Sequence, residues 1–256
     1  MNYETLQVRL QDSICFVQFD RPQANNTINQ RLVEECHQVL DACENSATVI
    51  VFSGNAEVFC FGADFQGIRD RSVNPAGAAD EGGPDRLYDL WLRMANGPFV
   101  TVAHVRGKVN AGGVGFVAAA DIALADESAK FSLSELLFGM IPACVLPFLV
   151  RRIGFQRAHY LTLMTQPIGV EQAHAWGLVD AWEAQSETLL RKHLLRLRRL
   201  SATALGRYKR YVNEIVPALH SCRQAALSTN TEVFSDPRNI QDIVRYVETG
   251  AFPWEA

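Results

Sequence analysis

Short apolar strand patterns alternate with helical patterns over most of the chain, and this alternation restricts the possible folds more than any other feature. Residues 6–10 and 14–19 alternate polar and apolar side chains around Gln11-Asp12, which is typical of a β-hairpin. Helical spacing over 29–43 and an apolar run over 48–52 follow. Strands that alternate with helices favour an α/β fold with a parallel sheet.

The alternation continues to about residue 179 and then changes. We expect strands at 99–105, 122–125, 130–132 and 177–179, and helices at 85–95, 114–120, 146–153, 157–165 and 170–176. Residues 70–84 are rich in Gly, Pro, Ala and Asp without periodicity, which predicts a mobile loop. Beyond Glu187 the pattern is helical and rich in Arg. We therefore expect a core over 1–186 and a helical C-terminal region over 187–256.

Composition and charge exclude several classes of protein. The 256 residues are 48% hydrophobic and 20% charged, as in soluble globular proteins. A formal net charge of −4 provides no basic field for nucleic acid. Residues 1–21 lack a signal-peptide pattern, and prolines interrupt the apolar run 140–150, which is shorter than the roughly 20 residues that span a bilayer. We expect a cytoplasmic protein without membrane or nucleic-acid partners.

The six cysteines show neither CxxC pairs nor metal-ligand spacing with histidine. They are expected to be reduced and structural, with no bound metal. Cys60 in particular has no evident nearby base, which favours a buried filler over a nucleophile.

Two turns of small residues, each able to expose backbone N–H groups, carry the strongest chemical signal. They are Phe61-Gly62-Ala63-Asp64 and 110–115, and Glu135 follows in 131–135. Preorganised backbone donors stabilise an enolate or alkoxide that develops on a thioester oxygen, and a bulky side chain at either turn would block that approach. A dinucleotide site is disfavoured because 112–115 lacks full GxGxxG spacing and a ribose-binding acid downstream.

The ordered combination of these motifs resembles the crotonase, or enoyl-CoA hydratase/isomerase, superfamily over nearly the whole chain. The motifs are Arg21-Pro22 after the hairpin, 59–64, 107–121, 131–142 and 173–179. The resemblance implies a crotonase fold, with a repeated ββα spiral core and a C-terminal helical region that contributes to trimers or hexamers.

The resemblance also implies roles for individual residues. The N–H groups of Ala63 and Gly112 would form an oxyanion hole, and Glu135 matches the second of two glutamates in the family's hydratases. Gly115 stands where those enzymes carry the first glutamate, which we expect to open volume and to remove negative charge from the pocket. Glu135 has an alternative structural role, as the first residue of a helix capped by Ser134.

The remaining candidate residues surround those groups. Asn110 is expected either to orient a leaving hydroxyl or water, or to cap the local backbone. Asp64 is expected either to support its loop or to act as a second acid or base. Substrate contacts are expected at Phe61, Asp64, Gly113, Gly115 and Phe138.

A closer resemblance, carried by 110–116, 132–139 and 142–147, is to the first crotonase enzyme of polyketide β-branching cassettes. That subgroup dehydrates 3-hydroxy-3-methylglutaryl groups on an acyl carrier protein to 3-methylglutaconyl groups. The resemblance implies a lyase with no metal or redox cofactor, whose substrate carries its own phosphopantetheine arm. The basic stretch from Arg191 to Arg199, continued by Arg207, Lys209 and Arg210, is then either a solvated helix face or a contact for carrier-protein acids or substrate phosphates.

Three alternatives remain open from the sequence. The chain could be a fatty-acyl enoyl-CoA hydratase or isomerase, a decarboxylase of the methylglutaconyl product, or a non-catalytic module that binds acyl carrier proteins. A hydratase predicts gain of water, an isomerase predicts migration of the double bond, a decarboxylase predicts loss of carbon dioxide, and the module predicts binding without turnover.

Overall fold

The computed structural model describes residues 3–73 and 83–255, and its strands form two sheets. The larger sheet has the order β1 (Leu6–Gln11), β2 (Ile14–Phe19), β3 (Val49–Ser53), β5 (Val100–Val105), β7 (Ile122–Ala125), β10 (Ala181–Trp182). The smaller sheet has the order β4 (Val58–Cys60), β6 (Lys108–Asn110), β8 (Lys130–Ser132), β9 (Ile168–Gly169). All neighbouring strands are parallel except the pairs β1–β2 and β8–β9.

Successive strands are shared between the two sheets in a regular way. β3, β5 and β7 are neighbours in the larger sheet, whereas β4, β6 and β8, each following one of them in the chain, are neighbours in the smaller sheet. Helices lie between these strand pairs, notably α3 (Pro84–Asn96) after β4 and α4 (Gly112–Ala119) after β6. The repeating unit is therefore strand, strand, helix, and the mixed α/β fold predicted from the sequence is confirmed.

Helices pack against the larger sheet through their apolar faces. α1 (Gln30–Cys43) begins at Asn29, whose Oδ1 accepts from Leu32 N at 2.9 Å. Its apolar face is fully buried, as are Phe19, Phe52 and Phe116, whose rings contact one another between the sheet and α4. This core fixes the strands whose ends carry the site.

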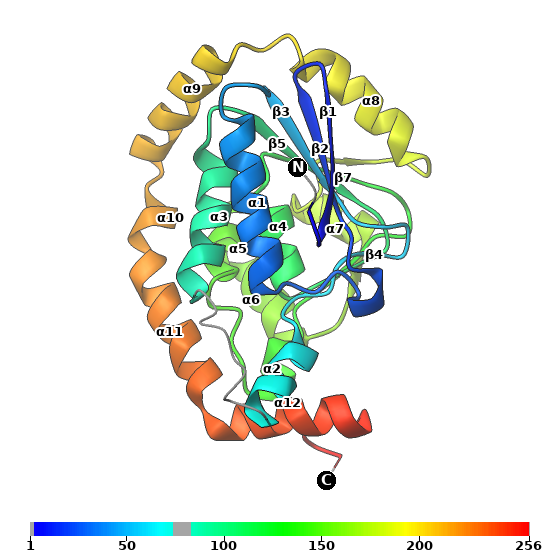
Figure 1. Cartoon of the computed structure of the whole chain (residues 1–256), viewed down its shortest axis with the longest axis vertical. Coiled ribbons are helices and arrows are strands. Elements are labelled where there is room, and N and C mark those ends of the chain that lie inside the picture. The colour runs from blue at the N-terminus through cyan, green and yellow to red at the C-terminus, as the bar shows by residue number, and fades with distance from the viewer. Residues whose placement is uncertain (1–2, 74–82, 256) are drawn as a thin grey trace.

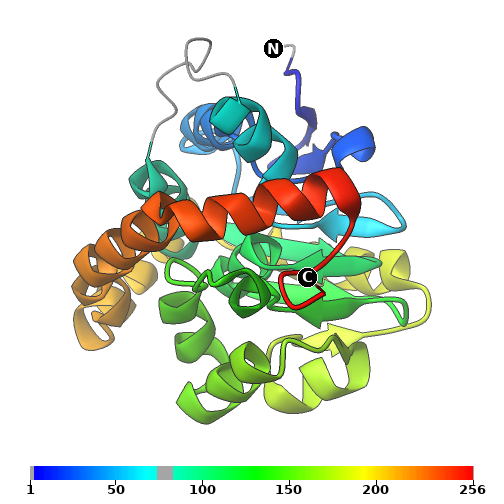
Figure 2. The same ribbon diagram turned by 90° about the horizontal axis from the view of Figure 1, so that it is seen from below.

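The other helices complete the chain and form its outer layer (Figure 1). They are α2 (Phe65–Val73), α5 (Leu146–Ile153), α6 (Phe155–Met164), α7 (Val170–Trp176), α8 (Ser186–Leu197), α9 (Ala202–Ile215), α10 (Ala218–Ser221), α11 (Arg223–Ser235) and α12 (Pro237–Thr249), with short 3-10 turns η1 (Pro22–Ala24) and η3 (Glu135–Phe138). Helices α9 to α11 run as an arc along one side of the molecule, and α12 crosses its lower end beside α2 (Figures 1 and 2).

Three expectations for local structure need correction. Residues 70–73, predicted as part of a loop, continue α2, and α3 already begins at Pro84, while 74–82 lie outside the described residues. Residues 177–179 form a turn rather than a strand, because Gly177 has φ +86° and its N–H closes α7 on the carbonyl of Ala173. The strand is β10, which starts at Ala181.

Lys209 does not belong to a solvated basic face. Its side chain is 5% exposed, and Nζ donates to Asp121 Oδ2 at 2.6 Å and to the Met94 carbonyl at 3.3 Å. The buried amine therefore ties α9 to the core. The basic stretch 191–199 lies on α8 and the turn after it, at the opposite end of the molecule from α2 and α12 (Figure 1).

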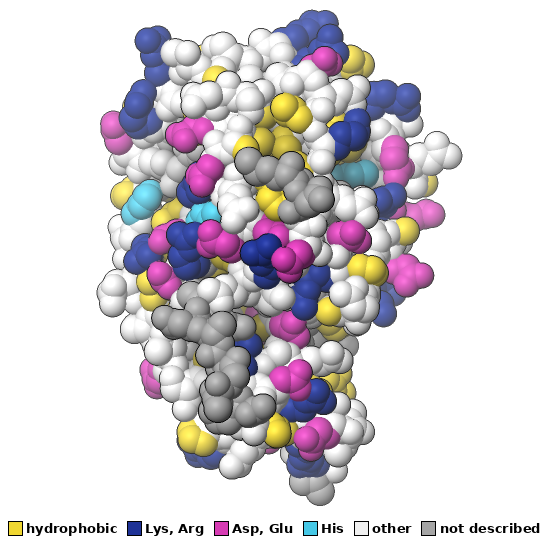
Figure 3. Space-filling model, viewed as in Figure 1, with side chains coloured by type: hydrophobic (Ala, Val, Ile, Leu, Met, Phe, Trp, Pro, Cys, Tyr) yellow, Lys and Arg dark blue, Asp and Glu magenta, His cyan; other side chains and the backbone are white. Residues whose placement is uncertain are grey.

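Charged side chains of both signs are interspersed over the face shown in Figure 3. Helices in the described part of the chain are all too short or too polar to cross a membrane.

Candidate active site

Three parallel strands of the smaller sheet end at one edge, and each leads directly into a candidate segment. β4 is followed by the turn at 61–64, β6 by Ala111 and Gly112, and β8 by 133–135. Asn110 pairs with Ser132, and Cys60 pairs with Val109 after a register shift in β4, so the three strands end within one residue of one another. The carboxyl ends of parallel strands are a common place for ligand sites.

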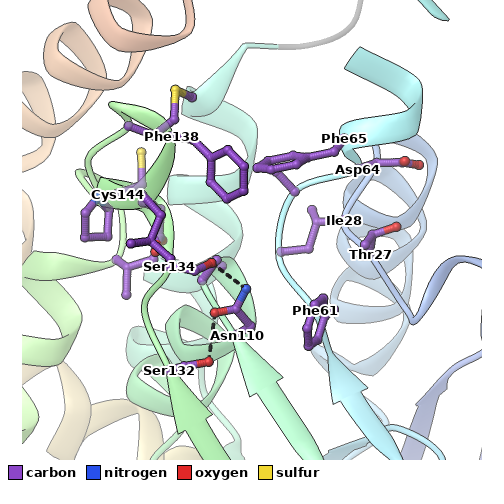
Figure 4. Close-up of a pocket in the computed structure, with 18 of the residues that line it drawn as sticks. Thr27, Ile28, Phe61, Asp64, Phe65, Asn110, Ser132, Ser134, Phe138 and Cys144 are labelled. Carbon is purple, nitrogen blue, oxygen red and sulfur yellow. Dashed lines mark hydrogen bonds between the residues drawn. The ribbon is translucent and has the colours of Figure 1, made fainter. Parts of the chain in front are cut away.

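These segments border a cavity of about 560 Å³. Figure 4 shows side chains from the three segments pointing into the same space, together with Thr27 and Ile28. Seven of the nine candidate residues line this cavity: Phe61, Ala63, Asp64, Asn110, Gly112, Glu135 and Phe138. Asp64 and Glu135 are the acids among the described lining residues, which include no Lys, Arg or His.

The backbone N–H groups of Ala63 and Gly112 are unused within the described part of the chain. Around Ala63, the neighbouring amides form the pairing with Ile28: Ile28 N donates to Gly62 O at 2.7 Å, and Asp64 N donates to Ile28 O at 3.2 Å. Gly112 is the first residue of α4, so its N–H has no acceptor in the helix. A Cβ placed on Gly62 would lie 3.3 Å from Gly112 N, which brings the two turns side by side.

Glu135 opens η3 with its carboxyl group in an apolar environment. Its Oε2 is buried and has no hydrogen-bond partner among the described residues. Desolvation raises the pKa of the Glu135 carboxyl to about 7, although hydrogen bonds from the backbone N–H groups of Glu135 and Ser134 act in the opposite direction. A carboxyl group with this pKa can both accept and return a proton near neutral pH.

Asp64 is engaged in supporting its loop. Its Oδ2 accepts from Arg21 at 2.8 Å, and its Oδ1 accepts from Gly67 N at 3.1 Å in the first turn of α2. Arg21 also donates to the Thr27 carbonyl and hydroxyl. These contacts match the supporting role among the two expected for Asp64.

Gly113 and Gly115 do not line the cavity, contrary to expectation. A Cβ on Gly113 would lie 2.2 Å from the Cys60 carbonyl oxygen, so this glycine allows α4 to approach β4. A Cβ on Gly115 would lie 2.3 Å from Cη2 of Trp91 in α3. The indole fills the space that we expected to be open. Trp91, a lining residue missed by the sequence analysis, is buried, with no hydrogen-bond partner for its Nε1 in the described residues.

The side chains of Asn110 and Ser134 form a hydrogen bond with each other and do not cap the backbone. Asn110 Nδ2 donates to Ser134 Oγ at 2.8 Å, and Ser134 makes no side-chain cap on η3. The capping roles considered for both residues are therefore absent, although Glu135 does begin a short helix. Cys60 is fully buried, and desolvation raises the pKa of its thiol to about 12, as expected of a structural filler.

The C-terminal helices also line the cavity, which the sequence pattern did not indicate. Phe138 packs at 5.0 Å, between ring centroids, on Tyr246 of α12, and at 5.2 Å on Phe65 of α2. Phe252 lies 5.8 Å from Phe138. The aromatic spacing in 234–252 identifies an apolar helix face but does not identify the surface it covers.

Ala111, directly before Gly112 in the second turn, has an uncommon backbone conformation with φ +51° and ψ −122°. Such a conformation costs an alanine on the order of 1–3 kcal/mol and a glycine much less. We expect Ala111→Gly to raise the free energy of unfolding by about 1 kcal/mol, after the larger chain entropy of unfolded glycine is included, as measured by urea denaturation.

The control for this prediction is Ala120→Gly, because Ala120 is buried at an ordinary φ of −64°. This variant should lower the free energy of unfolding by about 1 kcal/mol. Destabilisation of the Ala111→Gly variant as well would show that the conformation of Ala111 carries no strain.

Comparison with known proteins agrees with the fold. The family model for enoyl-CoA hydratase/isomerase matches residues 9–256. The chain is 56% identical over 256 residues to the bacillaene synthase dehydratase PksH of Bacillus subtilis, covering 100% of this chain and 98% of that protein. The crystal structure of pksH from Bacillus subtilis superposes with a TM-score of 0.95, covering 98% of this chain and 100% of that one. An enoyl-CoA hydratase from Bacillus halodurans, 18% identical, has the same fold with a TM-score of 0.83, covering 94% and 99% of the two chains.

The chain therefore belongs to the enoyl-CoA hydratase/isomerase family and has the crotonase fold. It is an enzyme of this family with a likeness to the polyketide dehydratase PksH along its whole length. Within the described residues, no three His, Cys, Asp or Glu side chains form a cluster able to hold a metal ion.

Proposed function

We propose that this enzyme removes water from a 3-hydroxy-3-methylglutaryl thioester on an acyl carrier protein and so forms the 3-methylglutaconyl thioester. The observation that carries the proposal is the difference between the two acids that line the cavity. Glu135 has a carboxyl oxygen without a hydrogen-bond partner among the described residues, whereas Asp64 is paired with Arg21. Full-length similarity to a dehydratase of polyketide synthesis supports the reaction class.

The unused backbone donors are suited to the thioester carbonyl. In the proposed reaction, Ala63 N–H and Gly112 N–H bind the carbonyl oxygen and stabilise the negative charge that develops when C2 loses a proton. Each such donor is typically worth about 10²–10³ in rate. The binding of the oxygen also acidifies the C2 proton.

Glu135 then carries the proton through the reaction. It takes the C2 proton, the C2=C3 double bond forms as the C3–O bond breaks, and the leaving hydroxide receives the proton from Glu135 and departs as water. The glutamate ends as a carboxylate, ready for the next turnover. Hydration by two glutamates is disfavoured because the indole of Trp91 occupies the space beside Gly115. The elimination leaves the overall oxidation state unchanged, so the proposal includes no redox cofactor.

The proposal extends to partners and assembly as expectations. The pantetheine arm belongs to the substrate and would enter beside Phe61, which is 39% exposed at the cavity. A homotrimer or hexamer stays a prediction from the resemblance.

The rate of dehydration should depend on pH through Glu135. The ionised carboxyl is the base, and its pKa is raised to about 7, so kcat/KM is expected to increase with pH and to reach half its plateau near pH 7. Stopped assays from about pH 5.5 to about pH 8.5 measure this profile. A profile that is flat or falls over this range would contradict the assignment of Glu135 as the base.

A panel of thioesters separates the proposed function from its alternatives. The enzyme is incubated with 3-hydroxy-3-methylglutaryl, crotonyl and 3-methylglutaconyl groups, each on a carrier protein and on coenzyme A, and the products are weighed by mass spectrometry. We expect loss of water from the first group. Water gain by crotonyl groups alone would indicate a fatty-acyl hydratase, and loss of carbon dioxide from methylglutaconyl groups alone would indicate a decarboxylase. Binding without any mass change and without migration of the double bond would indicate a non-catalytic module.

A further inference from the structure

A chain of polar side chains crosses the cavity wall between the ends of β6 and β8. Ser132 Oγ donates to Asn110 Oδ1 at 2.9 Å, and Asn110 Nδ2 donates to Ser134 Oγ at 2.8 Å. All three residues line the cavity, and Figure 4 shows both hydrogen bonds. Ser132 and Asn110 are also partners in the strand register, which holds the first bond in place.

Counting hydrogens along this chain leaves two without an acceptor among the described residues: the hydroxyl hydrogen of Ser134 and the second amide hydrogen of Asn110. The single hydroxyl hydrogen of Ser132 is taken by Asn110, and the amide oxygen of Asn110 is thereby satisfied. Ser134 Oγ accepts from Asn110, so its own hydrogen points elsewhere, and it donates to no described residue. The Ser134 oxygen accepts no capping N–H from η3, so the short helix does not fix the direction of this side chain.

The hydroxyl donor of Ser134 lies next in sequence to an unused acceptor. Glu135 Oε2 has no partner among the described residues, and both residues line the same cavity. A hydroxyl group of the substrate can accept a hydrogen bond from Ser134, and its oxygen can leave with a proton from Glu135. The two adjacent side chains therefore suit a leaving hydroxyl group. The other described acid of the cavity, Asp64, is bound to Arg21 and cannot supply this pair.

We infer that Ser134 is a further catalytic residue, whose hydroxyl donates a hydrogen bond to the C3 oxygen of the substrate as that oxygen leaves. The inference rests on the proposed dehydration. Ser134 keeps its hydrogen throughout: the C3–O bond breaks, C2=C3 forms, and the proton that completes the water comes from Glu135. Asn110 is the positioning residue, because its amide fixes the direction of the Ser134 hydroxyl.

The role of Ser134 can be separated from that of Glu135 with two substrates. The 3-hydroxy-3-methylglutaryl carrier protein reports the complete elimination through the loss of water. The 3-methylglutaryl carrier protein has no C3 hydroxyl, so exchange of its C2 hydrogens in deuterated water reports only proton abstraction and the oxyanion hole. Ser134→Ala is compared with wild type on both, and Ser46→Ala, at an exposed serine in the turn after α1, is the matched control.

We expect Ser134→Ala to lower the rate of water loss about 10²-fold, as for removal of one transition-state hydrogen-bond donor. Its C2 exchange on 3-methylglutaryl groups should stay within about threefold of wild type, which also shows that the variant is folded. Unchanged water loss, or an equal fall in both rates, would overturn the role of Ser134. If wild type exchanges C2 hydrogens but removes no water, the proposed dehydration fails, and this inference falls with it.

Discussion

Glu135→Gln is expected to lower the rate of water loss about 10³-fold, because glutamine keeps the shape of the side chain but cannot take the C2 proton. The backbone donors at Ala63 and Gly112 are untouched, so substrate binding should be retained. The measurement is single-turnover conversion of the 3-hydroxy-3-methylglutaryl carrier protein with enzyme in excess. A variant as fast as wild type would exclude Glu135 as the base.

The free energy of unfolding of Glu135→Gln tests whether the lower rate of water loss comes from unfolding. The raised pKa of Glu135 means that the native chain keeps this proton up to about pH 7, whereas the unfolded chain loses it near the ordinary value of 4.5. Stability therefore falls as pH rises between these values, and above pH 7 the buried charge costs up to about 3 kcal/mol. Glu135→Gln should recover much of this at pH 8 and little at pH 5. The control is Glu127→Gln, on an exposed loop, which should change neither rate nor stability.

Gly115→Ala is expected to destabilise the protein by about 2–3 kcal/mol, because the new Cβ would lie 2.3 Å from Trp91 Cη2 and 2.5 Å from Cζ2. The indole cannot move aside easily, since its ring packs edge to face on Phe116 and Phe148, each with 5.7 Å between centroids. Thermal and urea unfolding measure the effect. A glutamate at this position would be worse accommodated still, so Gly115→Glu should not create a two-glutamate hydratase.

Two further variants test the cause of this destabilisation. Gly206→Ala lies within α9 with its Cβ 3.5 Å from Pro98, an ordinary contact, and should stabilise the helix by about 0.5–1 kcal/mol. Combining Gly115→Ala with Trp91→Ala removes the clash, so the double variant should lose at least about 1 kcal/mol less than the sum of the two single losses. Simple addition of the losses would show that Trp91 does not exclude a side chain at Gly115.

The sequence predicted most elements of the larger sheet and its covering helices, because periodicity reports burial over several turns. The hairpin, α1, β7, α5 and α7 are where they were expected. The strands β4 and β6 were not anticipated, although β8, also three residues long, was; a run of three residues is too short for periodicity to identify it consistently. They nevertheless carry the two turns of the site.

The parts of the candidate site that depend on backbone N–H groups in small-residue turns could be predicted from the sequence. The parts formed by side chains from distant elements could not. The turns at Ala63 and Gly112 and the carboxylate of Glu135 are brought to one cavity. The prediction that Gly115 opens volume in the pocket was wrong. A glycine in the sequence does not reveal which side chain packs against it. Trp91 is 24 residues away in the chain, and no local pattern connects its indole with Gly115.

The most direct test of the account is the intact mass of a carrier protein loaded with a 3-hydroxy-3-methylglutaryl group, before and after incubation with the wild-type enzyme. We predict conversion to a species lighter by one water, at a rate that increases with enzyme concentration. A carrier protein whose mass stays unchanged at saturating enzyme would contradict the proposed dehydration.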